Sequence, residues 1–120
     1  MGKINKFDLE ERTYQFGLAC VKFSRTLKPT YFERPIITQF VKSGTSLGAN
    51  YCEANDAESK NDFIHKIGIC KKESKETKYW VRMLGDIYPE NKPNVEPLAS
   101  EIDELILIFS AIIRTSNKKS

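Results

Sequence analysis

The stretch from Phe40 to Tyr51, which reads FVKSGTSLGANY, has the small residues and hydroxyls of a phosphate-binding loop. A P-loop needs four residues between its glycines and then Lys-Ser or Lys-Thr, because backbone amides and the ammonium must reach the phosphates. Here three residues separate Gly44 from Gly48, and alanine and asparagine follow. The preceding residues have helical rather than strand-like spacing, so the dinucleotide-binding fingerprint fails too. We therefore expect no phosphate site in this stretch.

The single histidine, His65, and a run of acids are the next groups that could do chemistry. Glu53, Asp56 and Glu58 could form a carboxylate cluster for acid–base work or for a metal. Acids at the end of a helix, however, are more typical of capping and solvation. His65 lies opposite the expected core face of its helix, and no Cys/His set around it could bind zinc. We expect no metal, with an enzyme that uses Glu53 as the alternative.

Three cysteines, Cys20, Cys52 and Cys70, lie within apolar patterns and form no Cys-x-x-Cys pair. An odd number without such pairing is typical of buried thiols in a reducing compartment. None has an evident base partner, which a thiol nucleophile requires. The hydroxyls of the glycine stretch likewise have no His or Asp companion. Because no catalytic set completes itself, we expect no catalytic residues, no cofactor and a protein that is not an enzyme.

The size and composition indicate a single folded domain over residues 1–120. A chain of 120 residues and 13.8 kDa has room for one core of normal volume. It is 40% hydrophobic and 29% charged, which excludes a disordered chain. No run approaches the roughly 20 apolar residues of a membrane helix, and the first residues lack the apolar run of a secretion signal. The expected location is cytoplasmic, with no membrane contact.

Helical spacing of apolar residues recurs in four segments, and all five prolines lie between these segments or in a first turn. The segments cover about residues 8–27, 35–54, 60–88 and 96–115, and the proline-rich stretch 89–94 is the clearest loop. No strand-like alternation competes over a comparable length. Four helices with short connections predict an all-α, antiparallel up-down four-helix bundle.

One side of the third helix is mostly basic. Successive residues placed about 100° apart put a core stripe on one face, which comprises Phe63, Ile67, Cys70, Ser74, Thr77, Val81 and Leu84. A second face is mostly basic and comprises Lys60, Ile64, Lys71, Lys75, Lys78 and Arg82. The last four are the candidate nucleic-acid contacts. Residues 59–85 hold seven Lys or Arg and three Asp or Glu, a surplus that favours contact with nucleic-acid phosphates. The alternative is a solvated face, or one that pairs with acids of the fourth helix such as Glu101 and Glu104.

A third set of residues on this helix is apolar and comprises Ile69, Trp80, Met83 and Ile87. These residues lie more than a quarter turn from the core stripe, whereas a helix in a monomeric bundle needs only one apolar face. Exposed aromatic residues and methionine are typical of protein interfaces, so the set predicts self-association. The alternative is a wide core stripe with scattered surface hydrophobes. A symmetric oligomer would also multiply the basic face.

Two stretches, SGTSLGANYCEA and KNDFIHKIGICKKESKETKYWVRML, resemble a bacterial family. It is the family of small four-helix-bundle proteins found in intervening sequences of 23S ribosomal RNA genes, often labelled a ribosomal-protein family. The resemblance covers about residues 40–84. It includes an Asn followed three residues later by a Glu, which in this chain are Asn50 and Glu53. The resemblance does not define the role of these two residues. Many relatives place Gly after that Glu, where this chain has Ala54, so a different interhelical turn is expected.

The resemblance implies an up-down bundle that assembles into a homo-oligomeric ring, with a pentamer favoured. The chain is also similar to accessory proteins of diversity-generating retroelements, which form basic pentameric barrels and work with a reverse transcriptase and nucleic acid. We therefore expect a non-enzymatic protein that binds RNA, or a ribonucleoprotein or reverse-transcriptase-like partner, through the basic third helix. The alternative is a protein–protein scaffold or accessory subunit without direct nucleic-acid contact.

Gly44 and Gly48 continue a helical face that also carries Ile37, Val41 and Tyr51. Each glycine weakens a helix by roughly 1 kcal/mol relative to alanine. That cost indicates that another helix packs closely here, where a larger residue would obstruct it.

Overall fold

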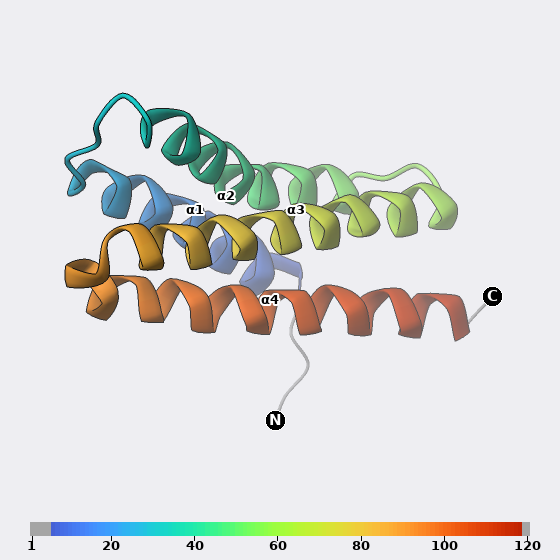
Figure 1. Ribbon diagram of the computed structural model, residues 1–120. Helices are drawn as coiled ribbons and strands as arrows, with labels where there is room; N and C mark the ends of the chain where they lie inside the picture. Colours follow the sequence, from blue (N-terminus) through green and yellow to red (C-terminus); the bar gives the residue numbers. More distant parts are fainter. Residues whose placement is uncertain (1–5, 119–120) are drawn as a thin grey trace.

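Four α-helices run alternately up and down the molecule in the computed structural model, which describes residues 6–118 (Figure 1). In chain order they are α1 (Lys6–Arg25), α2 (Arg34–Asn55), α3 (Lys60–Ile87) and α4 (Lys92–Lys118), with a 3-10 turn, η1 (Pro89–Asn91), before α4. No strand occurs within the described residues. The outer ends of the expected 1–120 domain lie outside them. None of these four helices is long and apolar enough to cross a bilayer.

Local signals explain where the two middle helices begin. Ser59 is extended and caps α3, because its hydroxyl accepts the backbone N–H of Asp62 at 3.0 Å. Pro35 lies in the first turn of α2, where its missing N–H would have had no helical partner. The connection between the two helices is therefore a short polar turn of residues 56–59.

Helix α4 begins at Lys92, earlier than the expected start near residue 96. The stretch 89–94, expected to be a loop, is instead the turn η1 followed by the first turn of α4. Pro93 lies in that first turn, where an N–H has no carbonyl partner in any case. Pro97 lies inside α4 and removes one hydrogen bond, a cost that burial of the apolar side chains on either side offsets.

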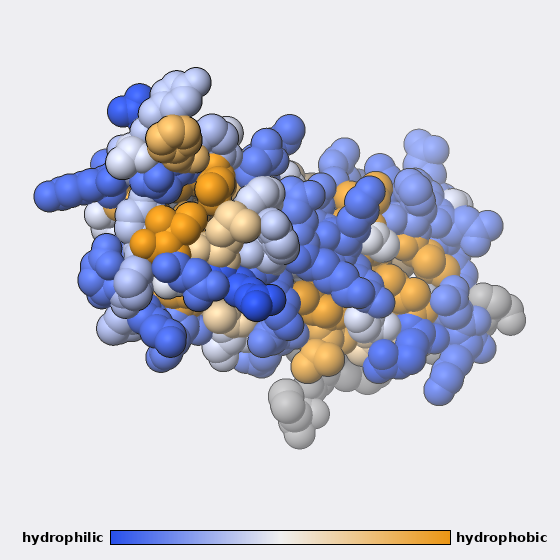
Figure 2. Space-filling model, in the orientation of Figure 1, coloured by the Kyte–Doolittle hydropathy of each residue, from blue (hydrophilic) through white to orange (hydrophobic). Residues whose placement is uncertain are grey.

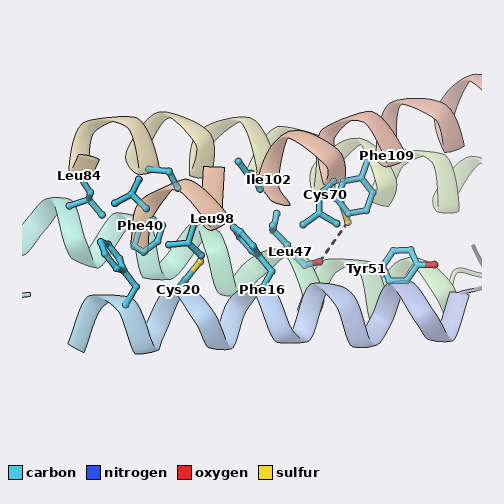
Figure 3. Close-up of a cluster of buried hydrophobic side chains, with 14 of the residues drawn as sticks. Phe16, Cys20, Phe40, Leu47, Tyr51, Cys70, Leu84, Leu98, Ile102 and Phe109 are labelled. Carbon is cyan, nitrogen blue, oxygen red and sulfur yellow. Dashed lines mark hydrogen bonds between the residues drawn. The ribbon is translucent and has the colours of Figure 1, made fainter. Parts of the chain in front are cut away.

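The core lies between the four helices, and each helix contributes side chains to it (Figure 3). Phe23 of α1 and Phe40 of α2 meet edge to face with ring centroids 6.2 Å apart. Four buried hydroxyl residues interrupt the apolar interior, namely Thr13, Ser43, Ser74 and Thr77. Each donates to a carbonyl three or four residues earlier in its own helix. The core therefore leaves none of these hydroxyls without a hydrogen bond.

Helices α1 and α2 approach each other closely along a line of glycines. A Cβ atom on Gly44 would lie 2.7 Å from Cys20 Sγ, and one on Gly48 would lie 3.4 Å from Thr13 Oγ1. A Cβ on Gly17 of α1 would in turn lie 3.4 Å from the backbone of α2. The glycine stretch is thus helical, and the helix that packs against it is α1 of the same chain.

Helix α1 meets α4 over a much smaller area than it meets α2. It has 20 residues, and α3 and α4 run on beyond its first turn (Figure 1). Arg12 bridges the two helices: its Nε donates to Glu101 Oε2 at 2.6 Å and its Nη2 donates to Glu101 Oε1 at 2.7 Å. Nη2 also lies 3.1 Å from Glu104 Oε1. The hydrogen bonds that Arg12 donates, above all those to Glu101, hold the pKa of the Arg12 guanidinium above its ordinary value.

Candidate nucleic-acid interface

Helix α3 carries the four candidate cations, Lys71, Lys75, Lys78 and Arg82, which we call the α3 cation stripe. Lys75, Lys78 and Arg82 are exposed, and Lys71 is partly buried. Lys78 Nζ lies 2.8 Å from Asp103 Oδ1 of α4. Because the stripe follows one side of a helix, this contact places it on the side of α3 that faces α4.

Only part of the stripe is neutralised by neighbouring acids. Within residues 6–118, Lys78 forms an ion pair, whereas Lys71, Lys75 and Arg82 form none. The alternative that acids of α4 pair with the stripe holds at one position, where Asp103 pairs with Lys78, whereas the two acids named as examples, Glu101 and Glu104, bind Arg12 of α1 instead. These two acids face α1, and Asp103 lies on the other side of α4. Three of the four cations therefore remain available to an external anion.

The part of the stripe that is farthest from acids of α4 is its N-terminal end, at Lys71 and Lys75. Near the other end, the stripe borders a groove of about 320 Å³ between α3 and α4. Three cations line it together with three acids, namely Lys78, Arg82 and Lys92 with Asp86, Glu96 and Asp103. Positive and negative charges are therefore mixed there. Lys71 and Lys75 lie outside that lining and have no acid of α4 paired to them.

An exposed apolar residue of α4 lies level with the turn of α3 that holds Lys75. Because α3 and α4 are antiparallel, the residue one turn after Asp103 faces the turn of α3 that precedes Lys78. That residue is Leu107, which is 69% exposed. In Figure 2, hydrophilic residues cover most of the visible face. Hydrophobic residues are exposed between them in patches, which are densest near the end where α3 terminates. The stripe thus lies on a surface of mixed character.

The apolar set predicted to be a subunit interface is only partly exposed. All four members, Ile69, Trp80, Met83 and Ile87, are of intermediate burial. Trp80 and Ile87 pack against the core, so the chain itself uses part of their apolar surface. Met83 and Ile87 line a groove of about 350 Å³ together with Tyr79. Tyr79 is 56% exposed and was not indicated by the sequence pattern, because it falls between the apolar set and the cation stripe.

The side chains considered for catalysis do not form a reactive site. Burial raises the pKa of both the Cys20 and the Cys70 thiol to about 12, so neither supplies a thiolate at neutral pH. Cys52 is exposed, so the expectation of a buried thiol is wrong for this cysteine. Partial desolvation and nearby carboxylates raise the pKa of Cys52 as well. His65 is exposed. Within residues 6–118, no group of three or more His, Cys, Asp or Glu side chains could hold a metal ion.

Asn50 and Glu53, the residues that the family resemblance singles out, lie near the end of α2 and do not meet each other through a hydrogen bond. The Asn50 amide donates to the Ser46 carbonyl of its own helix at 2.9 Å. Glu53 is exposed. It is Asn55 that joins two helices here, because its amide donates to Glu10 Oε1 of α1 at 2.7 Å.

Two surface features escaped the sequence reasoning. A groove of about 450 Å³ follows the outer side of the α1–α2 contact, and its lining includes Tyr14, Leu18, Val21 and Cys52. Only the helical register could have indicated that these residues share one surface. The second feature is Tyr31 and Phe32 in the connection between α1 and α2, which are strongly exposed. Hydrophobic residues in a short loop look in sequence like core residues, so no pattern distinguished them.

Comparison with known proteins places the chain in a family. The family model of the 23S rRNA-intervening sequence proteins matches residues 5–111. The chain belongs to this family. A crystal structure of a protein of unknown function, from the S23 ribosomal protein family of Bacteroides thetaiotaomicron VPI-5482, is similar to it at 31% identity and a TM-score of 0.79. That similarity covers 87% of this chain and 96% of the other. Among curated proteins, none matches the sequence.

Proposed function

We propose that the protein is a non-enzymatic RNA-binding protein that contacts phosphates through the α3 cation stripe. The observation that carries the proposal is that Lys71, Lys75 and Arg82 share one side of α3 and have no acidic partner within residues 6–118. Lysine and arginine side chains are among the main donors to nucleic-acid phosphates, which supply half or more of the hydrogen bonds in such complexes. The family description, which refers to 23S rRNA, supports RNA as the nucleic acid to test first.

Binding of labelled structured RNA, measured by fluorescence anisotropy at two salt concentrations, tests this proposal. Lys71→Glu with Lys75→Glu should weaken binding by more than about tenfold at low salt. The slope of log binding constant against log salt concentration should become shallower by about the amount expected for two lost phosphate contacts. Lys22→Glu with Lys42→Glu changes the net charge equally, and both lysines are exposed on other helices, α1 and α2. Equal losses in the two double variants, or no RNA binding by the wild type at low salt, would contradict the proposal.

We also propose that the chain forms a cytoplasmic homo-oligomeric ring, with a pentamer favoured. The groove that Tyr79, Met83 and Ile87 line on α3 and the exposed Leu107 of α4 support a subunit contact. The three cysteines are free, which supports a reducing compartment. Light scattering should give a multiple of 13.8 kDa that falls in Met83→Glu. A wild-type mass equal to one chain would contradict the ring.

The second candidate function is a protein–protein scaffold or accessory subunit without direct RNA contact, with a ribonucleoprotein or reverse-transcriptase-like protein as a possible partner class. The ion pair of Lys78 with Asp103, with 2.8 Å between Nζ and Oδ1, favours it, because it shows the stripe partly satisfied inside the chain. This candidate predicts partner capture that survives nuclease and is unchanged in Lys71→Glu with Lys75→Glu.

A further inference from the structure

Tyr31 and Phe32 are the most exposed of the large hydrophobic residues for which the structure gives a side chain, at 80% and 78%. They lie in the connection between α1 and α2, at the end of the molecule where η1 lies (Figure 1). Their rings meet edge to face, with centroids 5.8 Å apart and planes at 84°. Each ring therefore fixes the orientation of the other, and the pair projects into solvent as one unit.

The backbone under this pair is held by Glu33. The Thr30 hydroxyl donates to Glu33 Oε2 at 2.7 Å, and the Thr30 backbone N–H donates to Oε1 at 3.0 Å. The Phe32 N–H in turn donates to Thr30 Oγ1 at 3.3 Å. The Thr30 hydroxyl, and then its N–H, hold the pKa of Glu33 below its usual range. The turn that carries the aromatic pair therefore has one carboxylate, that of Glu33, and hydrogen-bond donors of Thr30 already bind it.

Three exposed cations flank the pair in the chain: Arg25 at the end of α1, Lys28 in the connection and Arg34 at the start of α2. None of them forms an ion pair with any residue between 6 and 118. The acid nearest in sequence, Glu33, points its oxygens at Thr30, and Asp86 in the last turn of α3 and Glu90 of η1 also lie at this end of the bundle. Residues 25–34 themselves carry three cations and one acid, so the segment that bears the two rings is net positive.

We infer that Tyr31 and Phe32 form a stacking site for the unpaired bases of a single-stranded RNA, whose phosphates Arg25, Lys28 and Arg34 contact. Aromatic faces beside unpaired cations are the combination with which proteins bind single strands without reading sequence. A duplex offers its phosphates but keeps its base faces stacked inside, so the site discriminates against it. This inference rests on the proposed RNA binding and adds to it a second contact region and a strand preference.

A protein partner or a second copy of the chain fits the same surface less well. The cores of protein interfaces are enriched in aromatic residues and arginine but depleted of lysine, and Lys28 lies within four residues of both rings. Two rings also offer little apolar area compared with the several hundred Å² per partner that a standard interface buries. Both occupants remain outcomes of the test.

The test compares a labelled oligouridine of about 12 nucleotides, within the usual range of single-strand site sizes, with a blunt RNA duplex of equal length. Tyr31→Ser with Phe32→Ser should weaken oligouridine binding by about tenfold or more and change duplex binding by less than about twofold. Tyr31→Leu with Phe32→Leu keeps apolar area but removes the π faces, so it should lose about as much. Tyr14→Ser, at a site 60% exposed on α1, is the control and should change neither. Circular dichroism checks that each variant is folded.

The outcomes separate this inference from the proposed function. If Lys71→Glu with Lys75→Glu weakens both probes while the loop variants change nothing, RNA binding stands and the stacking site does not. Equal losses on oligouridine and duplex, or full binding by the leucine variant, overturn stacking in favour of charge or of a protein-docking role. A lower oligomer mass in the serine variant would assign the pair to a subunit contact and also overturn it. If the wild type binds neither probe at low salt, both proposals fail.

Discussion

The α1–α2 contact and the α3–α4 contact are built in opposite ways. Helices α1 and α2 meet through glycines, with almost no space for an added Cβ at Gly44. Helices α3 and α4 meet at their outer edge through charged side chains around a groove, as the pair of Lys78 and Asp103 shows. A larger side chain at a close backbone contact destabilises the fold. A substitution at an exposed charged edge has little effect on stability, and the side chains of such an edge are free to bind a partner. All four helices build the core, but the α1–α2 contact tolerates no added volume, whereas the outer edge of α3 and α4 offers a surface for partners.

The largest expected effect comes from filling the space between α1 and α2. Gly44→Leu should destabilise the protein by roughly 3 kcal/mol, because its Cβ alone would overlap Cys20 Sγ, which is itself fully buried. Urea unfolding followed by circular dichroism measures it. Gly68→Leu on α3 is the matched control, since no atom lies within 4 Å of its Cβ position. If both variants were equally stable, the α1–α2 contact would be looser than described.

The next effect concerns the sparse α1–α4 edge. Arg12→Met keeps the aliphatic reach but leaves Glu101, whose side chain is 28% exposed, without its bidentate partner. The expected loss is about 1 kcal/mol, after allowance for solvent screening. Glu104→Gln, at a side chain 61% exposed, should cost much less. Thermal unfolding of the two variants at low and high salt provides the comparison, and equal losses would argue against a special role for Glu101.

A smaller change, of opposite sign, is expected on α3. Gly68→Ala should stabilise the protein by about 0.5–1 kcal/mol, because alanine favours a helix over glycine and the added methyl meets nothing within 4 Å. Gly44→Ala has the same helix gain but meets Cys20, so the two alanine variants should shift the unfolding midpoint in opposite directions. A stabilising Gly44→Ala would show that Cys20 moves aside easily.

The smallest effect on stability is expected at the charged edge. Asp103→Asn should change the free energy of unfolding by less than about 0.5 kcal/mol, because both partners of the ion pair are more than half exposed. The same variant releases Lys78, so RNA should bind somewhat more tightly at low salt if the α3 cation stripe contacts phosphate. Weaker RNA binding in Asp103→Asn would instead assign the pair a positioning role.

Periodicity alone predicts the four helical segments and the core side of α3, because burial of one face imposes the same spacing on every helix. The start of α4 was predicted too late, since prolines that break a helix interior are tolerated in a first turn. The partners of the charged residues could not be predicted. Arg12 and Glu101 are 89 residues apart. Which acid of α4 faces which helix depends on how the helices are aligned along and rotated about their axes, and the spacing of apolar residues does not determine that alignment.

Trp80 is the only tryptophan of the chain. Its indole Nε1 is buried without an acceptor within residues 6–118, and its ring lies 4.9 Å from that of Tyr79. The protein therefore carries its own optical reporter at the last turns of α3. Emission excited through the tyrosines should reach Trp80 from Tyr79 by energy transfer, and a low-polarity indole should emit at short wavelength. A red shift on dilution, with the helix content unchanged, would report that this end of α3 has lost a neighbour.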